Sequence, residues 1–309
     1  MNIIFMGTSN FAVPSLQALV QADISIPMVV TQPDRPRGRG GKMTPTPVKQ
    51  AAEDYGITVF QPERIKDPKA INIVCDLKPD LIAVVSYGQI IPGELLKYPA
   101  YGCVNVHGSL LPAYRGAAPI QRAMMAGEKE TGITIMYMDE GLDTGDIILQ
   151  SVIPIEDGID HGNLENIMAS KGAALLMEAI KKLQNGTAPR IQQDNSRATY
   201  AHRLTREDEK INWQLPAANL HNLIRALSPA PGAYAQIKDT KIKIYRSRVV
   251  DQELAGKPGE ILEIHDHDFW VKTGNGILEI LELQREGKRR MAVKEFLQGF
   301  PLPKGASFH

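Results

Sequence analysis

The clearest structural signal in the chain is the segment Asn105-Val106-His107-Gly108-Ser109-Leu110-Leu111-Pro112. Residues 103–107 are apolar and β-branched around their polar members, which predicts the end of a buried strand. Because side chains alternate along a strand, Asn105 and His107 project from the same face. Ligands of open α/β sheets bind at the carboxyl ends of the strands, so we expect this amide and this imidazole to line a site.

A second stretch, Gly141-Leu142-Asp143-Thr144-Gly145-Asp146, supplies a carboxylate. Asp143 lies 38 positions after Asn105, between two glycines, in a loop that can fold back and bring it beside His107. An amide that stabilises an oxyanion, a histidine that moves protons and a carboxylate that orients the histidine suit acyl transfer without a covalent intermediate. The alternative is a structural role, since a lone Asn-x-His at a strand end is more often structural than catalytic.

Short apolar runs alternate with helical patterns before residue 104, with strands expected at 2–6, 28–31, 58–60 and 81–86 and helices at 11–21, 47–55 and 67–77. This order predicts an α/β fold with a Rossmann-like, mostly parallel sheet and helices on both faces. Ser9 or Asn10 is expected to cap the first helix, and Thr46 the second. Gly7 alone is no dinucleotide fingerprint, so no nicotinamide cofactor is expected.

The length of 309 residues predicts two domains. We place a catalytic domain at residues 1–188, in which 133–138 and 146–153 are paired strands and 161–183 is a long helix. A polar linker is expected at 189–203. In residues 204–309 a helix at 216–227 precedes five short strands, at 234–237, 241–250, 259–264, 269–272 and 277–284. These strands predict a small OB-like β-barrel, a type that often binds nucleic acid.

Composition excludes several classes of protein. The chain is 43% hydrophobic and 23% charged with a formal net charge of zero, so RNA contacts would need local basic patches. Cys75 and Cys103 give no disulfide framework and no metal spacing, and we expect two buried thiols in a reducing cytoplasm. We expect no signal peptide, no membrane helix and a monomer, because no basic n-region, long apolar run or obligate apolar interface is apparent.

Residues 31–49 form the clearest basic patch, with Asp34 set against five basic residues, Arg35, Arg37, Arg39, Lys42 and Lys49. Glycine and proline punctuate this stretch, which predicts a largely mobile loop. Such a loop is either solvated surface or an arm that contacts phosphates near the site. In the C-terminal region, basic residues also cluster at 241–248 and 285–290.

Four ordered motifs resemble the folate-dependent formyltransferases: residues 105–112, Arg115-Gly116-Ala117-Ala118-Pro119-Ile120-Gln121-Arg122, Thr131-Gly132-Ile133-Thr134-Ile135-Met136 and the stretch 141–146. Gln32-Pro33-Asp34-Arg35-Pro36, the glycine-rich basic run after it and the length of the C-terminal region are similar to members that act on methionyl initiator tRNA. The resemblance covers essentially the whole chain.

The resemblance implies catalytic roles for Asn105, His107 and Asp143, with 10-formyltetrahydrofolate as co-substrate and no metal. It also implies folate contacts by Ser109, Leu110, Leu111 and Pro112. The tRNA contacts that it implies are made by Arg39 and Lys42. From the residues alone, 109–112 is either a turn whose exposed backbone groups hydrogen-bond a flat heterocycle or a plain core turn. Arg115 is expected to meet an anionic ligand or surface carboxylates.

Three other functions remain open on the sequence. A formyltransferase for a small amine, such as glycinamide ribonucleotide or an amino sugar, would share the chemistry of the first domain but would not explain the basic loop and the barrel. A formyltetrahydrofolate hydrolase would use the same polar trio with water as acceptor. A non-catalytic folate- or RNA-binding module would not depend on Asn105 or Asp143.

Overall fold

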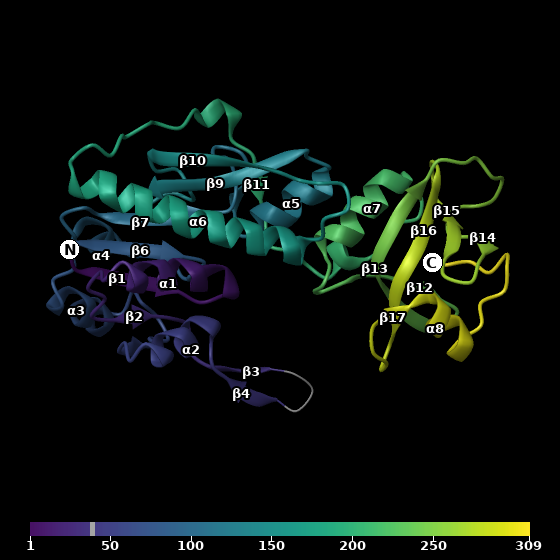
Figure 1. Ribbon diagram of the computed structural model, residues 1–309, viewed down its shortest axis with the longest axis horizontal. Coiled ribbons are helices and arrows are strands. Elements are labelled where there is room, and N and C mark those ends of the chain that lie inside the picture. The colour runs from purple at the N-terminus through teal and green to yellow at the C-terminus, as the bar shows by residue number, and fades with distance from the viewer. Residues whose placement is uncertain (38–40) are drawn as a thin grey trace. The chain divides into compact units, whose positions relative to one another are not determined.

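The computed structural model describes residues 1–37 and 41–309, and the chain divides into two compact units (Figure 1). Unit 1 comprises residues 1–116, 130–154 and 165–201, and unit 2 comprises residues 117–129, 155–164 and 202–309. Helix α5 (Pro119–Ala126) therefore clusters with the C-terminal part of the chain. The boundaries at 188 and 203 remain a prediction.

A seven-stranded sheet forms the centre of unit 1, in the order β10-β9-β7-β6-β1-β2-β5. Five neighbouring strands are parallel, and β9 and β10 extend the sheet in antiparallel fashion. This arrangement confirms the predicted α/β fold with a mostly parallel sheet. The strands are β1 (Ile3–Gly7), β2 (Val29–Val30), β5 (Val59–Phe60), β6 (Leu81–Val85), β7 (Cys103–His107), β9 (Glu130–Tyr137) and β10 (Ile147–Pro154).

Helices cover both faces of this sheet (Figure 1). Helix α6 (His161–Gln184) packs closely on one face, where a Cβ at Gly172 would lie 3.0 Å from Cγ1 of Val106. On the other face Cys103 shares a buried apolar cluster with residues of α3 (Pro68–Asp76) and α4 (Gly93–Lys97). Since side chains alternate, Asn105 and His107 follow Cys103 on this second face.

The first helical segment after β1 lacks the side-chain cap that was predicted for it. After β1, the chain forms a short 3-10 helix, Asn10–Ala12, and then α1 (Val13–Gln21). Ser9 does not cap it, because its hydroxyl donates to Oγ of Ser86 at 2.9 Å, across two strand ends. Thr46 does cap α2 (Pro47–Asp54), accepting from the Lys49 amide at 3.1 Å, as predicted.

The basic stretch contains regular structure where a mobile loop was expected. Strands β3 (Arg35–Arg37) and β4 (Lys42–Thr44) pair in antiparallel fashion, so these two segments are not irregular loop, and the mobility of the stretch stays a prediction. An ion pair at 2.7 Å between Lys49 Nζ and Asp34 closes its base and lowers the pKa of the Asp34 carboxyl. Arg39 falls in residues 38–40, outside the described residues.

Unit 2 contains a six-stranded antiparallel sheet. All five predicted strands are present, as β12 (Ala233–Ile237), β13 (Thr240–Val250), β14 (Ile261–Ile264), β15 (Phe269–Lys272) and β16 (Ile277–Arg285). The predicted helix is α7 (Ala217–Ala226). The sequence analysis missed β17 (Met291–Ala292), which pairs with β16, and α8 (Val293–Gly299).

The C-terminal residues join the two edges of this sheet. Phe308 forms a bridge with Ile237 on β12, and Ser307 forms one with Glu260 just before β14. The Phe308 ring is 2% exposed and lies 5.5 Å from the Trp213 ring and 6.1 Å from the Phe269 ring, centroid to centroid. The sheet is thus closed into a barrel by backbone pairing and by one aromatic anchor.

Two further predictions concern the chain as a whole. In the part that the structure describes, no helix is both long enough and apolar enough to span a bilayer. Cys103 is a buried thiol as predicted, whereas Cys75 on α3 is partly exposed, so that half of the prediction is wrong.

We predict that Phe308→Ala lowers the free energy of unfolding of unit 2 by about 3 kcal/mol, because it empties a buried aromatic site. Urea unfolding followed by the fluorescence of the adjacent Trp213 measures this. Leu215→Ala is the matched control, since Leu215 is 43% exposed in the same unit. A loss no larger than that of the control would mean that the C-terminal residues do not stabilise the barrel.

Candidate active site

Strand β7 carries Asn105 and His107 to the carboxyl ends of the parallel strands. It lies between β6, its parallel neighbour, and β9, which pairs Met136 with Asn105 and Thr134 with His107. The His107 ring is buried, while Asn105 is half-buried. Within the described residues the Asn105 carboxamide makes no hydrogen bond, so both its N–H donors are available to a ligand.

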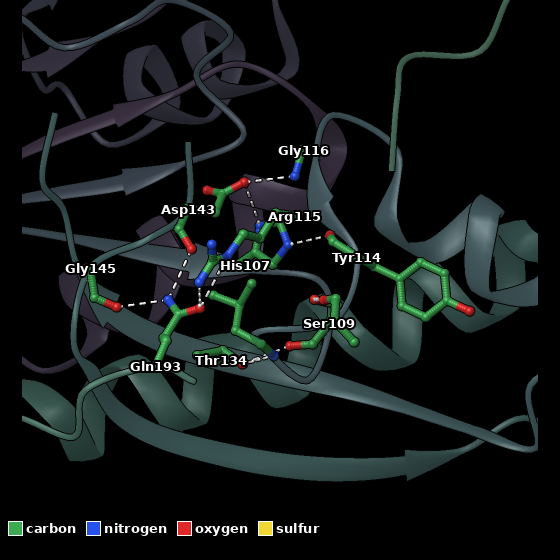
Figure 2. Close-up of polar contacts among 11 residues, drawn as sticks. His107, Ser109, Tyr114, Arg115, Gly116, Thr134, Asp143, Gly145 and Gln193 are labelled. Carbon is green, nitrogen blue, oxygen red and sulfur yellow. Dashed lines mark hydrogen bonds and ion pairs between the residues drawn. The ribbon is translucent and has the colours of Figure 1, made fainter. Parts of the chain in front are cut away.

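The structure brings Asp143 beside His107 (Figure 2). Oδ2 of Asp143 lies 3.7 Å from Nδ1 of His107, an ion-pair distance that is too long for a hydrogen bond. The same oxygen accepts the Gly116 amide at 2.8 Å. Nε2 of His107 lies 3.0 Å from the Tyr114 carbonyl, which can only accept, so this nitrogen carries a proton and Nδ1 faces the carboxylate.

The loop that holds Asp143 has a constrained backbone. Asp143 has φ +53°, in the left-handed region that non-glycine residues rarely occupy. Gly145 allows a close approach to β9, since a Cβ there would lie 1.8 Å from the Tyr137 carbonyl oxygen. Before them, the Asp139 carboxylate accepts from the Gly141 amide at 3.0 Å and the Thr144 hydroxyl at 2.6 Å. The two glycines predicted a loop here, and these contacts explain why the loop needs glycine.

The turn at 109–112 is held from within by Thr134 of β9. The Thr134 hydroxyl donates to the Ser109 carbonyl at 2.7 Å and accepts from the Leu111 amide at 3.1 Å and from Gln150 Nε2 at 2.9 Å. Gln150 also donates to the Leu111 carbonyl. The expectation of exposed backbone groups is therefore wrong at Ser109 and Leu111, which are both buried, while Leu110 and Pro112 stay half-buried.

Arg115 does not meet surface carboxylates, one of the two expectations from the sequence. Its guanidinium is 2% exposed and donates to Oε1 of Gln193 at 2.7 and 3.2 Å and to Oδ1 of Asn195 at 2.8 Å. In the described chain no carboxylate forms an ion pair with it. Arg115 thus holds the segment that contains Gln193 and Asn195 in place within unit 1, and it pairs with these two side chains where surface carboxylates were one expectation.

A cavity of about 470 Å³ adjoins the Asp143 loop. It is lined by Leu96 and Lys97 of α4 and by Met138, Asp139, Glu140 and Gly141, which follow β9. Sequence analysis identified none of these except Gly141. In the described residues no cluster of His, Cys, Asp and Glu side chains is arranged to hold a metal ion.

The family model described as "Formyl transferase" matches residues 1–180, and the one described as "Formyl transferase, C-terminal domain" matches residues 203–301. The chain belongs to the formyl transferase family. This confirms the family resemblance drawn from the sequence motifs. A relative named methionyl-tRNA formyltransferase, from Syntrophomonas wolfei, is 55% identical over 306 residues, which cover 99% of this chain and 98% of the relative.

Two solved structures share the fold. Methionyl-tRNA formyltransferase from Clostridium thermocellum superposes with a TM-score of 0.58 at 21% identity, covering 82% of this chain and 95% of that one. HypX from Aquifex aeolicus in complex with tetrahydrofolic acid gives a TM-score of 0.67 at 17% identity, covering 99% of this chain and 50% of that one.

Three residues of this candidate site were not predicted from the sequence. Thr134 had a signal, because it is a polar residue inside the expected strand 133–138, which is otherwise largely apolar. Gln150 had a similar signal inside the expected strand 146–153. Gln193 had none, since it lies in a polar stretch and only the folded chain brings it to the loop that holds Asp143.

We predict that Thr134→Val lowers the free energy of unfolding of the formyl transferase by about 2 kcal/mol, because buried partners lose their hydrogen bonds. Thermal or urea unfolding measures this. Thr131→Val is the matched control on the same strand, because the buried Thr131 hydroxyl has no partner in the described chain. The control should be neutral or stabilising, and equal losses in both variants would contradict the role given to Thr134.

Proposed function

We propose that this protein transfers the formyl group of 10-formyltetrahydrofolate to the α-amine of methionyl initiator tRNA. The observation that carries the proposal is the free Asn105 carboxamide beside the His107–Asp143 pair, at the carboxyl edge of the sheet. The choice of acceptor is supported by the full-length similarity to the Syntrophomonas wolfei methionyl-tRNA formyltransferase.

The reaction joins an amine to a formyl carbon in one addition and one elimination. An α-amine has a pKa of about 8, so roughly a tenth of it is uncharged at neutral pH and the amine needs little activation. Its nitrogen attacks the formyl carbon, a C–N bond forms, and the formyl oxygen becomes an oxyanion. The bond to the folate nitrogen then breaks, and that nitrogen takes up the proton that the amine loses.

Asn105, His107 and Asp143 have different roles in this reaction. Asn105, assisted by His107, donates a hydrogen bond to the oxyanion, an interaction of a kind that lowers a barrier by about 3 kcal/mol. Asp143 orients His107 and carries the proton from the attacking amine towards the leaving nitrogen. Because Nε2 of His107 is engaged by the Tyr114 carbonyl, proton exchange with Asp143 goes through Nδ1.

Folate binding is proposed for the turn 109–112 and for the cavity lined by Leu96, Lys97 and residues 138–141. Leu110 and Pro112 are half-buried and offer apolar surface, whereas the buried Ser109 and Leu111 hold the shape of the turn. A cavity of about 470 Å³ is large enough for a flat heterocycle. Asp139 Oδ1 accepts from Gly141 and Thr144 and Glu140 Oε1 pairs with Lys97, so Oδ2 of Asp139 and Oε2 of Glu140 are the acceptors proposed for the N–H groups of a pterin.

We assign Arg39 and Lys42 to the tRNA backbone, and the barrel to a second contact. Lys42 is exposed on β4. A β-bulge between Ile244 and Arg246 keeps Lys241, Lys243, Arg246 and Arg248 away from the barrel core, although Arg248 is paired with Glu279. Charged methionyl-tRNA is made and used in the cytoplasm, where we propose that this protein acts as a monomer.

The catalytic assignment predicts that Asn105→Ala and Asp143→Ala each lower kcat by about 100-fold or more, since one oxyanion donor and one proton-transfer residue each contribute that much. Transfer of radiolabelled formyl from 10-formyltetrahydrofolate to methionyl-tRNA measures this. Asn185→Ala, at an exposed position after α6, is the matched control and should keep wild-type activity. Activity of either site variant within tenfold of wild type would refute the mechanism.

The same assay separates the competing functions when glycinamide ribonucleotide is offered in parallel. Label on the small amine alone would identify a small-amine formyltransferase. Formate released with neither acceptor labelled would identify a hydrolase. No turnover of the formylfolate would leave a binding module.

The RNA assignment predicts that Arg39→Ala and Lys42→Ala raise the KM for methionyl-tRNA several-fold and leave the KM for the folate unchanged. Each should also reduce the slope of log KM against log salt by about 1, as expected when one phosphate contact is lost. Lys181→Ala, at an exposed position on α6, is the control. An unchanged salt dependence in both loop variants would remove the loop from the RNA site.

A further inference from the structure

Gln193 has a buried side-chain amide that contacts parts of unit 1 far from it in the sequence. It lies two residues after Ile191, which forms an antiparallel bridge with Ile147 at the start of β10. Its side chain is 6% exposed and points towards the Asp143 loop (Figure 2). It also falls outside both matched family regions, residues 1–180 and 203–301.

The two ends of the Gln193 amide have different partners. Nε2 donates to the carbonyl of Asp143 at 2.9 Å and to the carbonyl of Gly145 at 2.7 Å. Oε1 accepts from the Arg115 guanidinium, which can only donate. The orientation of the amide is therefore fixed, with its two N–H groups facing the loop carbonyls.

These bonds act on a residue whose backbone is in an unfavourable conformation. Asp143 has φ +53°, and a non-glycine residue keeps such a conformation only where its surroundings hold it. Gln193 holds the carbonyl side of Asp143, and the Gly116 amide holds its carboxylate at 2.8 Å. With both sides held, Oδ2 lies 3.7 Å from His107 Nδ1.

We propose that Gln193, oriented by Arg115, is a positioning residue for formyl transfer that keeps the Asp143 carboxylate directed at His107. This inference rests on the proposed function, in which Asp143 moves the proton. Gln193 touches neither substrate in this account, and its whole effect passes through the Asp143 loop.

Gln193→Glu is the informative variant. A glutamate still accepts from Arg115, so the buried guanidinium keeps a partner, but its carboxylate cannot donate to the carbonyls of Asp143 and Gly145. We expect kcat for formyl transfer to fall by about ten- to 100-fold, because a misplacement of about 1 Å has effects of this size. The KM values for both substrates should change less than about threefold.

Two further variants complete the design. Gln193→Asn keeps the amide but is one methylene too short to reach Arg115 and both carbonyls, and it serves if the glutamate variant does not fold. Gln192→Ala is the matched control, since this neighbour is exposed and makes no side-chain hydrogen bond in the described chain. The control should keep wild-type kcat.

A double-mutant cycle distinguishes positioning from general support of the fold. If Gln193 acts through the Asp143 carboxylate, Gln193→Glu should lower kcat by less than about threefold in an Asp143→Ala background. Equal losses in both backgrounds would overturn the inference, as would wild-type kcat in both Gln193 variants.

The assay uses whichever acceptor, methionyl-tRNA or glycinamide ribonucleotide, the wild-type protein formylates. A wild-type protein that is active on the small amine alone contradicts the proposed acceptor and leaves the cycle measurable. A wild-type protein that is inactive with both acceptors overturns the proposed function and this inference with it.

Discussion

The alternation of side chains along β7 is the constraint on which the site depends. Val106 packs under α6 on one face, so its neighbours Asn105 and His107 must project from the other. A slip of one residue in the pairing with β9 would exchange the faces and bury Asn105 under the helix. The same register sets Thr134 opposite His107, where its hydroxyl holds the turn that follows β7.

Local patterns in the sequence were enough to predict the elements of the site. An apolar, β-branched run predicted β7, and two glycines around Asp143 predicted a tight loop, because each feature depends on neighbouring residues only. Gln193 could not be found in this way, since it meets Arg115 across 78 positions of the chain. A polar stretch that looks like a linker gives no sign of such a contact.

Other errors had the same physical origin. The turn at 109–112 was expected to expose backbone groups, but partners from β9 and β10 satisfy them. Serine is a residue type that often caps helices, yet the Ser9 hydroxyl bonds instead to the Ser86 hydroxyl after a neighbouring strand. Arg35–Arg37 and Lys42–Thr44 looked too polar and too punctuated for strands, although pairing with each other satisfies their backbone groups. In each case a tertiary partner outweighed a local preference.

The closure of the barrel by residues 306–309 has a consequence for association between molecules. Without it, β12 and β14 would each present a row of unpaired backbone groups, the kind of edge to which a strand from another chain adds. Phe308 and Ser307 occupy these edges, and Phe308 pairs with Ile237, which lies 71 positions earlier in the chain. Protection against strand addition therefore carries the entropy cost of closing a loop of this length, a cost that the contacts of Phe308 must offset.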